Sequence, residues 1–187
     1  MKARIFLLTI LTLTFFPLTS LATEHAWDIE LDPPVAHATL AGTAVFKDVQ
    51  GQAWLRISCF QNPGDVSADL LIDSSLAESF PTGIYEGPGG LAEELPLLLV
   101  TVDKADKAAA FFASGTWQFN DPLQQNLVFQ WSFNPAQADI ERWINAPNRI
   151  VTVYIQQKDN TGPPLEASFL MPPSSQNVME MVAPRSK

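Results

Sequence analysis

Few residues in this chain have the types and spacing that metal binding requires. His25 and His37 stand on either side of Asp28 and Asp32, a set from which a metal site could be built. These four residues fall on a predicted strand and a proline turn, and they do not converge by spacing alone. Isolated surface histidines are therefore the favoured interpretation, and we predict no metal site and no cofactor.

Carboxylates form two groupings, the pair Glu93 and Glu94 and the series Asp65, Asp69 and Asp73. Two carboxylates serve glycoside hydrolysis when they face each other across a sugar site. Adjacent or alternating carboxylates on an exposed surface are not placed in that way. The chain also lacks the G-x-S-x-G, H-E-x-x-H and S-x-x-K motifs of common hydrolases, so we predict no catalytic residues.

Cys59 is the only cysteine of the chain. It alternates in phase with Leu55 and Ile57 within the segment 54–60, which places it on the apolar face of a predicted strand. A buried, inert thiol is therefore favoured over a nucleophile or an intermolecular bridge.

The five tryptophans are the remaining candidates for a binding surface, because several exposed indole rings could form a platform on which sugars stack. They are Trp27, Trp54, Trp117, Trp131 and Trp143. Most of them are in phase with other apolar residues, so core packing is the default interpretation.

Strands must position these residues, and the stretch 127–157 carries the strongest local signals. Large apolar residues fall at every second position of 127–133, the period of a half-buried strand. The segment 149–157 is rich in β-branched residues and apolar on both faces, as expected in the middle of a sheet. Between them Ile140, Trp143 and Ile144 lie three and four residues apart, which predicts a short helix over about residues 135–145.

Similar alternation recurs along the chain, separated by turn residues. Counting these segments gives about eight short strands at the spacing expected of a sandwich. We therefore predict a mainly β protein, a single antiparallel β-sandwich with one short α-helix.

Residues 1–22 have the three parts of a secretory signal peptide. Lys2 and Arg4 precede an apolar run, and small residues at Ser20 and Ala22 suit cleavage, so we expect the mature chain to begin at Thr23. The alternative is an uncleaved anchor, although the apolar run is short for a membrane span. The predicted organisation is a signal peptide at 1–22, a β-sandwich domain at 23–173 and a C-terminal tail at 174–187, in a periplasmic or secreted protein that has no stable membrane insertion after cleavage.

The chain is acidic, with 20 Asp and Glu against 11 Lys and Arg and a formal net charge of −9. Such a surface repels phosphate backbones and anionic lipid, which argues against nucleic-acid and membrane-surface binding as main roles. A surface that keeps an exported protein soluble is favoured over an acidic patch for a basic partner, and both alternatives stay open.

Four features in order resemble known exported proteins: Trp27, the LRISC strand at 55–59, the ADIERWINAPNRIVTVYI unit and the closing EASFLM strand. With these the chain resembles periplasmic accessory proteins of type VI secretion and exported proteins of the invasion-associated locus B type. The likeness is one of pattern over the mature domain, and it implies a β-sandwich that binds or assists rather than catalyses. The chain departs from both families in having no second cysteine to pair with Cys59.

The loop 79–94 is the predicted binding surface. Phe80, Ile84, Tyr85 and Leu91 lie there outside any strong periodic pattern, among prolines and glycines. They have two possible fates, a plug over one end of the core or a contact surface for a partner, in which case Tyr85 would be the anchor.

Taken together, these patterns predict an exported, non-enzymatic binding or accessory protein of the bacterial cell envelope, with another envelope protein as its partner. The alternative is an envelope hydrolase that uses Asp and Glu residues of the 76–94 loop.

Overall fold

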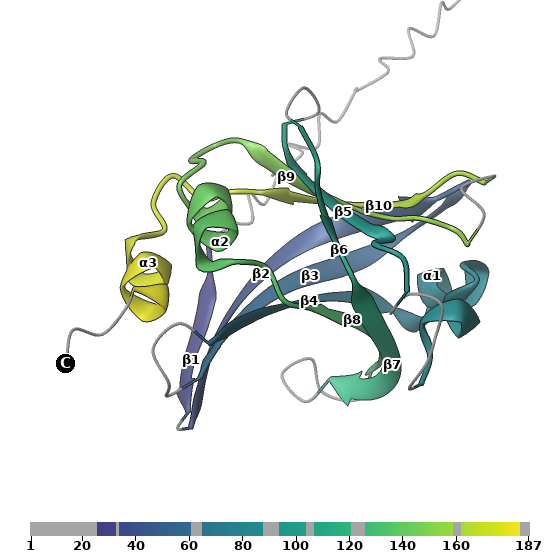
Figure 1. Cartoon of the computed structure of the whole chain (residues 1–187), viewed down its shortest axis with the longest axis horizontal. Coiled ribbons are helices and arrows are strands. Elements are labelled where there is room, and N and C mark those ends of the chain that lie inside the picture. The colour runs from purple at the N-terminus through teal and green to yellow at the C-terminus, as the bar shows by residue number, and fades with distance from the viewer. Residues whose placement is uncertain are drawn as a thin grey trace, which may run out of the picture.

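The chain folds around one antiparallel sheet (Figure 1). The computed structural model describes residues 26–32, 34–60, 65–87, 94–103, 107–120, 126–158 and 162–183. Its strands are β1 (Asp28–Asp32), β2 (Val35–Phe46), β3 (Val49–Phe60), β4 (Val66–Asp73), β5 (Leu98–Val102), β6 (Ala109–Phe111), β7 (Ala113–Asn120), β8 (Asn126–Phe133), β9 (Ile150–Ile155) and β10 (Leu165–Leu170). The helices are α1 (Ser74–Ser79), α2 (Gln137–Ile144) and α3 (Gln176–Val182), with a 3-10 turn η1 (Thr82–Tyr85).

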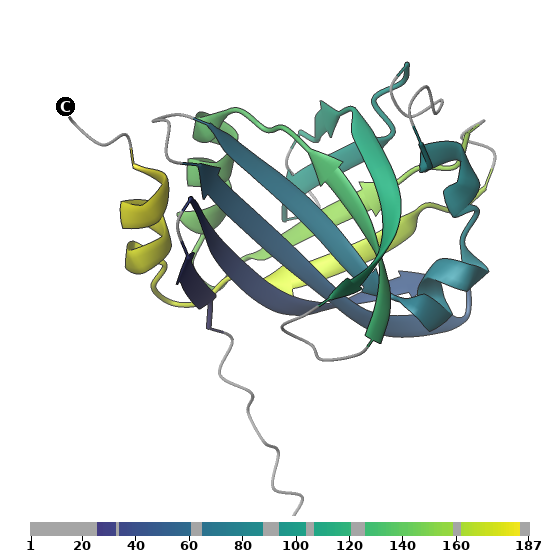
Figure 2. The same cartoon turned by 90° about the horizontal axis from the view of Figure 1, so that it is seen from below.

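The sheet is barrel-like and nearly closed, so the predicted sandwich is not what the chain forms. Strand order runs β6-β5-β9-β10-β2-β3-β4-β8-β7, with β1 beside β2. β6 pairs with β5 at one end of this order and β7 pairs with β8 at the other, and only Phe112 separates β6 from β7. One nearly continuous strand thus joins the two ends of the sheet and curls it (Figure 2). Period-2 alternation is the same in a sandwich and a barrel, which is why the sequence pattern did not distinguish them.

The segment 127–157 forms the predicted strand, helix and strand. β8 and β9 flank α2, whose buried residues are Ile140, Trp143 and Ile144, the three that share a predicted face. The helices α1 and α3 were not predicted as elements. Val178 and Val182 of α3 belong to the hydrophobic core, although they lie in the segment predicted as a tail. No helix in the described part of the chain is both long and apolar enough to cross a membrane.

The edge of β2 that lies opposite β3 is shared by two strands. β10 pairs with it at 43–45 and β1 pairs with it at 35–39, so β1 continues the track that β10 leaves. Gly42 lies at the split, where an added Cβ would be 2.5 Å from Cδ1 of Phe169. Because the Phe169 ring lies over the bare glycine backbone, β10 can still pair with β2 immediately beside this residue. β10 pairs with β2 no further than Thr43 and β1 pairs only as far as Thr39, so a gap separates the end of β10 from the start of β1.

Helices lie at opposite ends of the curled sheet. Figures 1 and 2 both place α1 at one end and α2 with α3 at the other. At the α1 end the rings of Phe80 and Tyr85 pack edge-on against Trp131, with centroids 6.0 and 5.8 Å away. At the α2 end Trp143 packs against Phe111 with ring centroids 5.9 Å apart. Each end of the core is thus filled by aromatic side chains.

Candidate functional site

We call the α1 end of the barrel the sealed end, because its described aromatic rings are buried. Phe80, which lies between α1 and η1, is 3% exposed, and Tyr85, the last residue of η1, is fully buried. The Tyr85 hydroxyl donates a hydrogen bond to the carbonyl oxygen of Gln156, just beyond β9, and burial raises the pKa of this hydroxyl. This end is held by ring packing and by a polar tie across the fold.

Of the other two predicted binding residues, the structure describes only Ile84. Ile84 is half-buried and packs against the core, and Leu91 lies outside the described residues. Gly115 of β7 lies against the plug, where an added Cβ would be 2.8 Å from Cβ of Tyr85. Phe80, Ile84 and Tyr85 therefore correspond to the plug alternative, and their burial leaves no ring available as an anchor for a partner.

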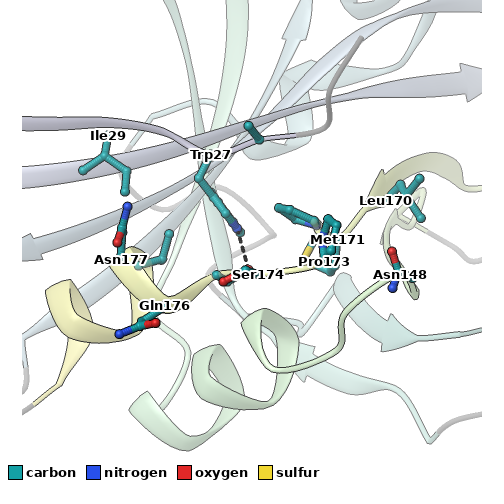
Figure 3. A pocket seen from close by; sticks show the side chains of 13 residues that line it. Trp27, Ile29, Asn148, Leu170, Met171, Pro173, Ser174, Gln176 and Asn177 are labelled. Carbon is teal, nitrogen blue, oxygen red and sulfur yellow. Dashed lines mark hydrogen bonds between the residues drawn. The ribbon is translucent and has the colours of Figure 1, made fainter. Parts of the chain in front are cut away.

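A pocket of about 670 Å³ opens at the opposite end, in the gap between β1 and β10 (Figure 3). Its walls come from four places: the start of β1, the turn before β9, the end of β10 with the segment that follows it, and the first turn of α3. They consist of Ala26, Trp27, Ile29, Asn148, Leu170, Met171, Pro172, Pro173, Ser174, Ser175, Gln176, Asn177 and Val178. Ligand pockets are commonly about 300–1,000 Å³, so this one has room for a small ligand or for side chains of a partner.

Trp27 ties two walls of the pocket together. Its indole Nε1 donates a hydrogen bond to Oγ of Ser175, 3.0 Å away and 148 residues along the chain (Figure 3). Ser175 precedes α3, but its hydroxyl makes no hydrogen bond that caps the helix. The interaction fixes the ring of Trp27 at the mouth of the gap, half-buried.

Every described residue that lines the pocket is uncharged. Side-chain amides at Asn148, Gln176 and Asn177 supply donors and acceptors among mainly apolar groups. Asn148 has a φ of 60°, in the left-handed region that asparagine tolerates better than most residues. Its N–H donates to the carbonyl of Met171 over 3.1 Å, which holds the turn beside the end of β10. The pocket therefore suits an uncharged ligand that is mainly apolar. A neutral polar group on that ligand could form hydrogen bonds with the three amides.

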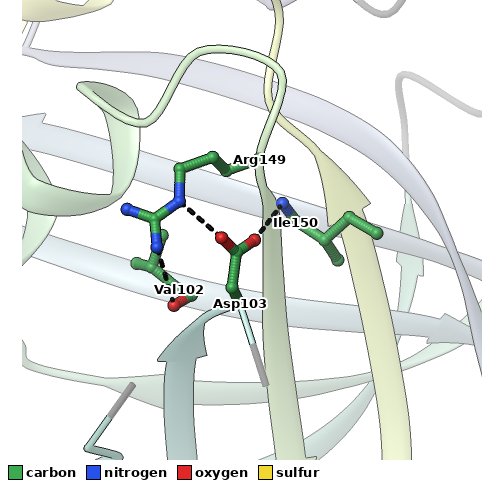
Figure 4. Close-up of polar contacts among 4 residues, drawn as sticks. All are labelled: Val102, Asp103, Arg149 and Ile150. Carbon is green, nitrogen blue, oxygen red and sulfur yellow. Dashed lines mark hydrogen bonds and ion pairs between the residues drawn. The ribbon is translucent and has the colours of Figure 1, made fainter. Parts of the chain in front are cut away.

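An ion pair holds the turn behind Asn148. Nε of Arg149 lies 2.6 Å from Oδ2 of Asp103, and the N–H of Ile150 donates to Oδ1 of the same carboxylate over 3.2 Å (Figure 4). The hydrogen bond from Arg149, followed by that from Ile150, lowers the pKa of Asp103. Both side chains are nearly half exposed, so the pair positions the turn without closing the pocket.

A second pocket of about 330 Å³ lies on the other side of the segment that leads into α3. It shares Pro173, Ser174, Ser175 and Gln176 with the first and adds residues of α2 and its following turn. The segment 173–176 is thus accessible from two sides. Pro173 and the adjoining Pro172 restrict the backbone here, and residues 171–175 belong to no helix or strand.

The nearest approach to catalytic geometry lies on the outer face of β2 and β3. Nδ1 of His37 is 2.9 Å from Oγ of Ser58, as in the pair that activates a serine nucleophile. Ser58 is only 3% exposed, so a substrate would not reach its hydroxyl. In the described part of the chain, no three His, Cys, Asp or Glu side chains are grouped so as to hold a metal ion.

Asp69 does not lie on the exposed surface predicted for the aspartate series. It is 7% exposed and accepts hydrogen bonds from Ser132 at 2.7 Å and Gln130 at 2.8 Å. Burial raises the pKa of Asp69, while the bonds from Ser132 and Gln130 and the charge of Arg56 act in the opposite direction. The sequence shows that Gln130 and Ser132 lie on one face of β8. It does not show that β8 pairs with β4, which brings these two side chains to Asp69.

Cys59 lies on the apolar face of β3, as predicted, but it is half-buried rather than buried. Its side chain packs against the hydrophobic core. The position near the end of the strand explains the remaining exposure, because the sheet covers its terminal residues less completely than its middle.

The fold and the site define an antiparallel, barrel-like β protein with one sealed end and one end that carries an uncharged pocket. Comparison with family models, with curated proteins and with solved structures found no match to the chain. The resemblance to exported accessory proteins therefore stays a prediction.

Proposed function

We propose that the protein is an exported, non-enzymatic binding or accessory protein of the bacterial cell envelope and that it binds its partner at the pocket beside Trp27. The observation that carries this proposal is the pocket of about 670 Å³ with uncharged walls. Binding sites in general combine a mainly apolar concavity with a few placed polar groups. Asn148, Gln176 and Asn177 are the placed polar groups here.

The alternative, a hydrolase acting through acidic residues of the 76–94 loop, has less support. The described acidic residues of that loop are Glu78, Glu86 and Glu94, and all three are exposed. None of them lines either pocket beside α3. A glycosidase needs two carboxyl groups facing each other across a substrate cleft. Glu78 lies in α1 and Glu86 follows η1, away from both pockets.

An affinity capture from the cell envelope tests the proposal. Asn177 is exposed and lines the pocket, so Asn177→Trp should fill the pocket without disturbing the core. The matched control is Ala183→Trp, which adds the same ring at the exposed end of α3, outside the pocket lining. We expect the wild type and the control to retain an envelope partner and Asn177→Trp to lose it, with equal melting temperatures for all three. Equal capture by the two variants would refute this placement of the site.

A further inference from the structure

β1 is an edge strand. It pairs with β2 from Asp28↔Thr39 to Asp32↔Val35, and among the described residues no strand pairs with its other edge. Such an edge presents unpaired N–H and C=O groups to which an extended peptide can add as a further strand. The free edge of β1 therefore supplies backbone hydrogen bonds that the pocket alone does not.

The two faces of β1 differ in chemistry. Asp28 and Glu30 are exposed on one face. On the other face Trp27 and Ile29 line the pocket, and Leu31 is 73% exposed. An exposed leucine that continues an apolar row beside a pocket is contact surface that the fold itself does not use.

The pocket and the edge are continuous in space. Ile29 of β1 and Asn177 of α3 are both part of the lining, and Figure 3 shows them beside each other with the gap running toward Met171. A segment that pairs with β1 would place alternate side chains against this lining. Its remaining side chains would lie beside Asp28 and Glu30, because successive residues of a strand point to opposite faces.

Charge selects the occupant. In a pair of these strands from two copies of the chain, acidic side chains would face acidic side chains, because the strand reads Asp-Ile-Glu-Leu-Asp. Like charges directly opposite each other destabilise strand pairing, whereas opposite charges stabilise it. A second copy is therefore disfavoured, and a segment with basic residues at alternate positions is favoured.

We infer that β1 binds an extended peptide segment in which Lys or Arg alternates with apolar residues, the basic side chains lying beside Asp28 and Glu30 and the apolar ones against the pocket. The inference rests on the proposed function, for which it specifies the class of partner. It also selects the acidic patch for a basic partner, the less favoured of the two interpretations of the acidic composition.

The test uses calorimetric titration of the protein with four synthetic heptapeptides. The first alternates Lys and Val, and the second replaces every Lys by Glu. The third and fourth carry the Lys-Val sequence with N-methyl groups either on all Lys or on all Val residues. In a strand the N–H groups of alternate residues point to opposite edges, so only one of these two peptides loses the hydrogen bonds to β1. Both retain the full charge.

Two charge-reversal variants accompany the peptides. Asp28→Lys with Glu30→Lys reverses the acidic face of β1, and Asp48→Lys with Glu78→Lys makes the same charge change at exposed positions outside both pockets. Reversing two facing pairs should weaken binding of the Lys-Val peptide about tenfold and should allow the Glu-Val peptide to bind. The control variant should change neither peptide as much.

We expect the Lys-Val peptide to bind and just one of its N-methylated forms to fail. Equal binding of both N-methylated forms, or an equal loss in the control variant, would mean general attraction to an acidic protein and would overturn strand addition. If the Lys-Val peptide does not bind while Asn177→Trp abolishes capture of the envelope partner, the peptide class is wrong and the proposed function stands. If the peptide does not bind and Asn177→Trp keeps the partner, both proposals fail. The comparison of N-methylated peptides needs only the wild-type protein, so it decides the matter even if a variant does not fold.

Discussion

The two ends of the barrel use the same device to different effect. At each end an aromatic ring with a polar tip makes a hydrogen bond to a distant segment, Tyr85 to Gln156 at one end and Trp27 to Ser175 at the other. Tyr85, the last residue of η1, is fully buried. Trp27 is half-buried and lines an open pocket. The polar tie alone therefore does not make a plug, and what covers the ring determines its role.

The difference follows from how the chain reaches each end. α1 continues directly from β4 and carries Leu76 and Ala77 into the core, so its plug forms from neighbours in the sequence. α3 reaches the other end after the adjoining residues Pro172 and Pro173. Ser175, just before α3, accepts its hydrogen bond from Trp27, which is 148 residues away in the sequence. A proline-restricted segment spans the gap without filling it, which leaves the pocket.

The largest expected effect comes from emptying the sealed end. Tyr85→Ala removes a fully buried ring, and large-to-small changes of aromatic core residues cost about 3–5 kcal/mol of unfolding free energy. Chemical denaturation followed by circular dichroism measures this loss. At temperatures where the variant is still folded, capture of the envelope partner should be unchanged.

Two further variants sharpen this first comparison. Tyr85→Phe keeps the ring and removes the hydroxyl that donates to the Gln156 carbonyl, which should cost about 1 kcal/mol of unfolding free energy.

Trp27→Ala should destabilise the fold less than Tyr85→Ala, because Trp27 is half-buried, and should weaken partner capture. Loss of capture in Tyr85→Ala with stability intact would place the binding surface at α1 and would reverse the comparison.

Much of the local structure could be predicted because it depends on short-range periodicity. The alternation over 127–133 and the three apolar residues of α2 are confirmed as β8 and as a buried helical face. Closure of the sheet could not be predicted, since it depends on the strands that β6 and β7 choose as partners. Those pairings are set by the whole core, and alternation reports only which face of a strand is apolar.

The pocket was missed for a related physical reason. Trp27 was interpreted as a core residue because it is in phase with Ile29, and that phase is correct for the face on which both lie. Whether the face is covered depends on where β10 leaves β2 and where α3 packs, which are contacts over long sequence separations. The two adjoining prolines after β10 are the local signal, but by themselves they indicate only that a strand ends.

The next prediction concerns the attachment of α1 at the sealed end. Asp73 caps this helix, with Oδ1 accepting from the N–H of Leu76 over 3.0 Å, and Oδ2 accepts from the N–H of Gln52. Burial would raise the pKa of Asp73, but the bonds from Ser75, Leu76 and Gln52 together lower it. Asp73→Ala should cost about 1 kcal/mol at neutral pH, the usual cost of losing a helix cap.

The sign of the pH dependence checks this attribution. A carboxyl with a lowered pKa stabilises the fold above its unfolded pKa, and this contribution disappears as the pH falls through the folded value. The difference in stability between wild type and Asp73→Ala should therefore narrow in acid.

The pKa of Asp69 is raised, so its pH dependence should have the opposite sign. Relative to Asp69→Asn, the wild type should lose stability as the pH rises from the unfolded pKa of Asp69 through its raised folded value. Parallel pH profiles for the two variants would contradict the assignment of opposite shifts.

The smallest effect is expected at the open end, in the turn behind the pocket. Asp103→Asn removes the charge that faces Arg149 but keeps an oxygen that can accept from Ile150, and asparagine tolerates the φ of 56° at this position. Exposed ion pairs contribute little and are screened by salt, so the melting temperature should fall slightly at low ionic strength and match the wild type at high ionic strength. Because the pKa of Asp103 is lowered, its contribution is present above the unfolded pKa and should vanish as the pH falls. Partner capture should stay intact, since Asn148 is held by its own bond to Met171. A large loss of stability that salt does not relieve, or a loss of capture, would show that the ion pair shapes the pocket, and the open end would then depend on charge as the sealed end depends on packing.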